Sequence, residues 1–92
     1  MDMRFFSVQD RKFVALIVLS DHNEFDAMEV AEIFDGGLRG ELLLEFRLDS
    51  NSARLSTIGP EVEIPLLRAS LEIFRQEFLA PREAAGLPCP QW

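Results

Sequence analysis

The densest cluster of polar side chains in the sequence is Asp21-His22-Asn23-Glu24, followed by Asp26, and it holds the single histidine. Such a cluster could supply oxygen ligands to a metal ion, or a histidine base oriented by a carboxylate. An EF-hand calcium loop is excluded, because Phe25 stands where a ligand is needed and Asp26 where glycine is needed. Asp21 and Glu24 have the spacing of a capping box, so we interpret the cluster as the beginning of a helix.

Other catalytic chemistry has little support in the sequence. The only cysteine, Cys89, lies between two prolines, away from any helix N-terminus that would activate it. No serine stands in a Gly-x-Ser-x-Gly motif. The glycines at 36, 37 and 40 follow an expected helix, which is the wrong order for a nucleotide-binding loop. We therefore predict no catalytic residues, no metal and no other cofactor, and we rank a metal- or His22-dependent enzyme last among three hypotheses.

The elements that would carry these residues begin with two short apolar segments. Met3–Val8 and Phe13–Ser20 are rich in β-forming residues and are separated by four polar residues, which predicts a hairpin. The second segment is apolar on both faces, which is typical of a central, covered strand.

A helix is expected next, over Asp21–Asp35. Ala27, Val30, Ala31 and Phe34 recur at helical spacing, and the glycine pair at 36–37 would end the helix. This interpretation places the polar cluster in the first turn.

A second hairpin and a second helix follow. Glu41–Leu48 alternates apolar and polar residues, and Ala53–Ile58 is a weaker strand near an edge. Apolar residues recur at helical spacing from Leu67 to Phe78, and Pro81 is expected to end this helix near Ala80.

The order hairpin, helix, hairpin, helix defines the expected fold class. It is α+β, with a four-stranded antiparallel sheet in ββαββα order, two hairpin–helix units, and both helices packed on one sheet face. We expect one domain over residues 1–80 and an extended or mobile tail over 81–92.

The first expected helix carries six acidic residues and no lysine or arginine. Its acidic face, with apolar flanks, is a candidate docking surface for a basic protein partner. The candidate partner-binding residues are Phe25, Asp26, Glu29, Glu32 and Ile33.

Uncovered apolar residues indicate self-association. The outer face of the Phe13–Ser20 strand would have no cover, and the second helix has a second apolar strip. The candidate self-association residues are Val14, Leu16, Val18, Leu66 and Ile73, and a two-fold homodimer is the expected assembly.

Composition limits the functional class. The chain has 92 residues and a net charge of −7, which disfavours direct binding to nucleic acid. The longest apolar run, Phe13–Leu19, is too short to cross a membrane, and a single cysteine is typical of a cytoplasmic protein. The leading hypothesis is a small, acidic, non-enzymatic protein–protein interaction or assembly module. The alternative is an acidic inhibitor or decoy that binds a basic, nucleic-acid-binding partner.

Overall fold

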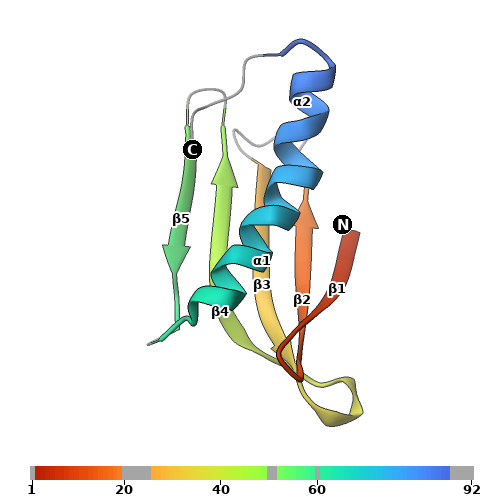
Figure 1. Cartoon of the computed structure of the whole chain (residues 1–92), viewed down its shortest axis with the longest axis vertical. Coiled ribbons are helices and arrows are strands. Elements are labelled where there is room, and N and C mark those ends of the chain that lie inside the picture. The colour runs from red at the N-terminus through yellow and green to blue at the C-terminus, as the bar shows by residue number, and fades with distance from the viewer. Residues whose placement is uncertain (1, 20–25, 50–51, 60, 88–92) are drawn as a thin grey trace.

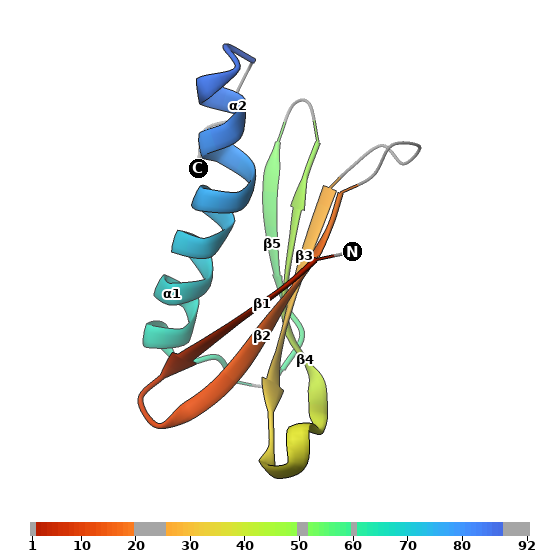
Figure 2. The same cartoon turned by 90° about the vertical axis from the view of Figure 1, so that its right-hand side faces the viewer.

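The computed structural model describes residues 2–19, 26–49, 52–59 and 61–87. It contains one antiparallel sheet of five strands, whose spatial order β1-β2-β3-β4-β5 is also their order in the chain. A single helical segment follows the last strand and crosses one face of the sheet obliquely (Figure 1). Among the described residues, nothing covers the opposite face (Figure 2). We call these two surfaces the helix face and the outer face.

The strands are β1 (Asp2–Val8), β2 (Arg11–Val18), β3 (Asp26–Ile33), β4 (Arg39–Leu48) and β5 (Ala53–Thr57). The helical segment consists of α1 (Ile64–Phe74), a π-helical turn (Arg75–Leu79) and α2 (Ala80–Ala84). A short 3-10 turn, Asp35–Gly37, lies between β3 and β4.

The predicted four-stranded ββαββα fold is wrong, because residues 26–33 form the central strand β3 and not a helix. Strand periodicity places Met28 and Val30 on the helix face, where both are fully buried, and Ala31 on the outer face. The alanines fit a helical stripe as well as a strand, but Met28 lies outside that stripe. Strand β2 is apolar on both faces, so its side chains bury most apolar surface when another strand pairs along each of its two edges. This tertiary requirement outweighs the helical pattern of residues 26–33.

The first hairpin and the strand over 41–48 are confirmed, and so is the weaker strand after residue 52. The first turn is tight, because Gln9 and Asp10 both have positive φ angles, of 51° and 30°. Two positive φ angles match the right-handed twist of the flanking strands in a two-residue hairpin loop. Gly36 and Gly37, which were expected to end a helix, provide positive φ angles in the β3–β4 connection instead.

The prediction that Pro81 ends the second helix is also wrong, since α2 continues to Ala84. The π turn before Pro81 gives the reason. There the Ala80 amide donates to the Arg75 carbonyl, five residues earlier rather than four. A proline ring inside a regular α-helix clashes with the carbonyl four residues back, and the wider turn relieves this conflict. The expected boundary between domain and tail at residue 80 therefore falls within a helix.

The main core lies between the helix and the helix face of the sheet. Phe46 of β4 stacks on Phe74 of α1 with ring centroids 5.0 Å apart, and Phe74 contacts Phe78 at the same distance. Towards the other edge, Phe6 of β1 stacks on Phe13 of β2 at 5.6 Å. The aromatic residues thus connect the helix to strands on both sides of the central strand.

Candidate functional site

Of the predicted polar cluster, the structure describes only Asp26. Asp21, His22, Asn23, Glu24 and Phe25 lie outside the described residues, and Asp26 is the first residue of β3. Cys89 also lies outside them. Within the part of the chain that the structure describes, no group of three histidine, cysteine or acidic residues could hold a metal ion.

The acidic docking surface cannot exist on a helix as predicted, because Asp26, Glu29, Glu32 and Ile33 belong to strand β3, and Phe25 lies outside the described residues. Neighbouring residues on a strand point to opposite faces. Glu29 and Ile33 therefore lie on the outer face, whereas Asp26 and Glu32 lie on the helix face. The structure does not bring these side chains together on one surface.

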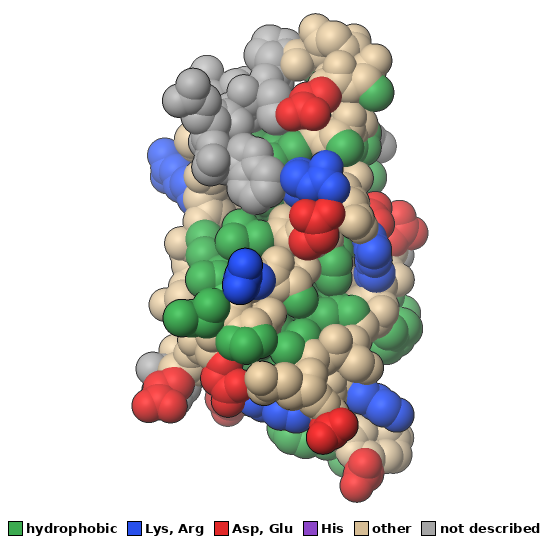
Figure 3. Space-filling model, viewed as in Figure 1, with side chains coloured by type: hydrophobic (Ala, Val, Ile, Leu, Met, Phe, Trp, Pro, Cys, Tyr) green, Lys and Arg blue, Asp and Glu red, His purple; other side chains and the backbone are tan. Residues whose placement is uncertain are grey.

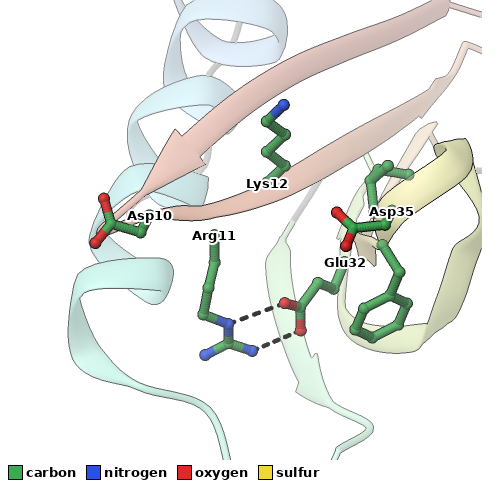
Figure 4. A pocket seen from close by; sticks show the side chains of 7 residues that line it. Asp10, Arg11, Lys12, Glu32 and Asp35 are labelled. Carbon is green, nitrogen blue, oxygen red and sulfur yellow. Dashed lines mark hydrogen bonds and ion pairs between the residues drawn. The ribbon is translucent and has the colours of Figure 1, made fainter.

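A polar pocket lies at the β1–β2 turn. It has a volume of about 380 Å³ and is lined by Asp10, Arg11, Lys12, Glu32, Ile33, Phe34 and Asp35. Figure 4 shows Arg11 and Glu32 pointing toward each other, whereas the side chains of Asp10 and Lys12 point away from the pair.

Arg11 and Glu32 form a two-point ion pair. The Nε and Nη2 atoms of Arg11 lie 3.0 and 2.6 Å from the two carboxylate oxygens of Glu32. These hydrogen bonds lower the pKa of Glu32 below its ordinary value, and Glu32 in turn raises the pKa of Arg11. A carboxylate held in its charged form in this way is a poor proton acceptor.

Arg11 also connects the sheet to the beginning of the helix. Its guanidinium lies 5.3 Å from the centre of the Phe13 ring, and its Nη1 atom lies 3.5 Å from a carboxylate oxygen of Glu63. Glu63 immediately precedes α1. The pocket is therefore built around ion pairs of Arg11 that join β2, β3 and the beginning of α1.

The outer face contains a second candidate surface. Strand register places Phe5, Val14, Ala31 and Leu42 in one row across β1 to β4, and Met3 beside Leu16 in the next row. Val14, Leu16 and Ala31 are buried in a small cluster of their own, supported by Ile33 and Leu42. The exposed members lie on β1, where the side chains of Met3 and Phe5 are 61% and 66% exposed.

The outer face changes character towards β5. In the row that begins with Val18 and Ala27, the next positions are Arg47 of β4 and Arg54 of β5. Glu45 also lies on this half of the outer face, where it accepts a 2.7 Å hydrogen bond from Arg47. The apolar part of the outer face thus lies on β1 and β2 and extends to Ala31 and Ile33 of β3 and Leu42 of β4, and it does not reach β5.

The structure divides the predicted self-association residues between two environments. Val14, Leu16 and Val18 lie on the outer face, as that hypothesis requires. Leu66 and Ile73 are buried in the main core between α1 and the sheet, where a second copy cannot reach them.

A third candidate surface is an apolar cleft between β5 and α1, which the sequence reasoning missed. It has a volume of about 200 Å³ and is lined by Phe46, Ala53, Arg54, Leu55, Leu71 and Phe74. Figure 3 shows hydrophobic side chains gathered between β5 and the helix on this face. The sequence indicates that β5 lies near an edge, but it does not indicate that the helix leaves a cleft beside this strand.

Comparison of the chain with protein-family models, with curated proteins and with solved structures finds no match. None of the described helices is long and apolar enough to span a membrane.

Proposed function

We propose that this protein is a non-enzymatic assembly module that forms a homodimer through strand β1. The observation that supports this proposal is the pair of exposed apolar side chains, Met3 and Phe5, on an edge strand. An edge strand offers unpaired backbone amide and carbonyl groups, and natural proteins usually protect such edges with charge, proline or a bulge. In β1 the central charge, Arg4, is turned to the helix face, where it contacts Glu77 at 3.2 Å.

A two-fold axis at Phe5 would pair the two β1 strands in antiparallel orientation. In that register Phe5 stands opposite its own copy, Arg4 stands opposite Phe6, and Asp2 stands opposite Val8. Like charges directly opposite each other would destabilise the paired strands, and this register places none there. The two outer faces join, so that the exposed apolar residues of both copies lie side by side at a self-complementary interface.

Sedimentation equilibrium over a wide concentration range tests this proposal. We expect a dimer, and we expect Phe5→Glu to raise its dissociation constant about 30-fold or more, as truncation of a central interface residue does. Because the Phe5 side chain is exposed, this variant should fold, which circular dichroism checks. The matched control is Ser56→Glu, which adds the same charge to the outer face of β5 and should leave the dimer unchanged.

High salt should not weaken the dimer, because its contacts are apolar and backbone-mediated, and screening reduces repulsion between two chains of charge −7. A wild-type chain that stays monomeric throughout would contradict the proposal. The single cysteine supports a cytoplasmic location for this assembly. The decoy hypothesis rests on net charge alone, and no described feature favours it.

A further inference from the structure

The cleft beside β5 is the right size for a side chain rather than for a small-molecule ligand. Pockets for drug-sized ligands usually measure about 300–1,000 Å³, whereas this cleft measures about 200 Å³. Its lining comes from three elements, with Phe46 on β4, Leu55 on β5, and Leu71 and Phe74 on α1. The side chain of Leu55 is 40% exposed, so the apolar lining reaches the surface.

The cleft lies directly beside an unpaired sheet edge. β5 pairs with β4 on one side, and no described strand pairs with its other side. An extended peptide can add to such an edge through main-chain hydrogen bonds, with alternate side chains entering adjacent pockets. In a strand added to β5, every second side chain would point to the helix face and reach the cleft, and the intervening ones would point to the outer face.

Charge on the outer face indicates which intervening side chains would fit. Arg54 stands directly opposite Arg47 in the β4–β5 register. Like charges in this arrangement are destabilising. Arg47 is hydrogen-bonded to Glu45, whereas Arg54 forms no ion pair with any residue in the described ranges. A carboxylate on the next strand would continue the row and balance the charge of Arg54.

We propose that the β5 edge and the adjacent cleft bind an extended peptide that alternates acidic and apolar residues. One apolar side chain enters the cleft between Leu55 and Leu71, and a neighbouring carboxylate pairs with Arg54 on the outer face. A second copy of this chain does not satisfy these requirements, because pairing two β5 strands would place two Arg47–Arg54 pairs on the same face.

Fluorescence anisotropy with a labelled hexapeptide, SELEVS, tests this site on the full chain. We expect saturable binding, and we expect the lysine counterpart SKLKVS to bind at least tenfold more weakly. Arg54→Glu should reverse this preference, weakening SELEVS and strengthening SKLKVS. This exchange is a response that a merely structural role for Arg54 would not give.

Leu55→Asp tests the cleft itself and should lower the affinity for SELEVS about tenfold or more. Since Leu55 is partly exposed, the variant should fold, and an unchanged urea midpoint would verify this. The matched control is Phe5→Glu at the opposite edge, which should abolish dimer formation and leave peptide binding intact. The failure of the peptide proposal is therefore distinguishable from the failure of the dimer proposal.

Three results would overturn the proposal. They are no binding of SELEVS, equal binding of both peptides, or affinities that neither Arg54→Glu nor Leu55→Asp alters. If only a Trp92→Ala variant bound SELEVS, the occupant of the cleft would be the C-terminal segment of the chain itself, and the proposal would be wrong.

Discussion

The two edges of the sheet are joined to the helix in different ways. Near β1, ion pairs connect sheet and helical segment, from Arg4 to Glu77 and from Arg11 to Glu63 at the beginning of α1. Along β5, contact is apolar, and Arg54, the only charged residue of that strand, forms no ion pair with any described residue of the helix. The helix consequently closes against the β1 side and leaves a cleft on the β5 side.

The two edge strands, β1 and β5, present their charged and apolar side chains on opposite faces of the same sheet. At β1, strand alternation places Arg4 on the helix face, where it pairs with Glu77, and places Met3 and Phe5 on the outer face. At β5, the arginine remains on the outer face and the apolar residue faces the helix. This contrast supports the proposals that the first edge pairs with a copy of itself and that the second binds a strand of opposite charge.

The largest expected effect comes from the buried aromatic residues near each edge. Phe13→Ala and Phe46→Ala should each lower the free energy of unfolding by about 3–5 kcal/mol. Phe46 lines the cleft, so the surrounding side chains can relax when its ring is removed. The decrease in the free energy of unfolding for Phe46→Ala should therefore fall at the lower end of that range. Phe13 is enclosed by the Phe6 ring and the Arg11 guanidinium and should fall at the upper end. Urea unfolding midpoints measure both.

A larger loss for Phe46→Ala than for Phe13→Ala would contradict this contrast. It would mean that the helix packs as tightly along β5 as along β1, and that the cleft is not an open feature of the fold.

A smaller effect is expected from the ion pair between Arg11 and Glu32. The pKa of Glu32 is lowered in the folded chain from its ordinary value of 4.5 by hydrogen bonds from Arg11. The stabilisation is therefore complete above that value and is lost as pH falls through the lower, folded pKa. Since the Arg11 side chain is 46% exposed, we expect about 0.5–1 kcal/mol at neutral pH.

Urea unfolding of the wild type and of Glu32→Gln between pH 7 and pH 3 measures this contribution. The difference in free energy of unfolding between the wild type and Glu32→Gln should decrease as the solution is acidified below pH 4.5. Glu77→Gln removes the single 3.2 Å contact with Arg4 and should give a smaller gap at neutral pH. A gap for Glu32→Gln that does not change with pH would show that the ion pair makes no charge-dependent contribution.

An effect of similar size but opposite sign is a gain in stability at Ser70 of α1. Its side chain is fully buried, and its Oγ atom has no hydrogen-bond partner among the described residues. Ser70→Ala removes an unsatisfied group and improves helix propensity, so we expect a gain of about 0.5–1 kcal/mol. Ser56→Ala on exposed β5 should change stability by less than about 0.5 kcal/mol. A loss of stability in Ser70→Ala would reveal a hydrogen bond of the Ser70 hydroxyl that stabilises α1.

The parts of the fold that local patterns encode were predictable, and the parts that depend on neighbours were not. The alternation in β4 and the helical spacing from Leu67 to Phe78 correspond to real elements. Within residues 26–33, Ala27 and Ala31 suit either period, and the place of the segment between β2 and β4 selects the strand. The cleft and the exposed positions of Met3 and Phe5 depend on which strands form the edges, and sequence periodicity does not specify strand order.

The π turn at Arg75–Leu79 has a consequence for how sequences of this fold can vary. It accommodates one residue more than a regular helical turn would, and Pro81 is the residue that makes the wider turn favourable. We expect related chains with alanine in place of this proline to lack one residue between positions 75 and 79. Chains that retain the proline should keep the full length, so the proline and the insertion should be inherited as a pair.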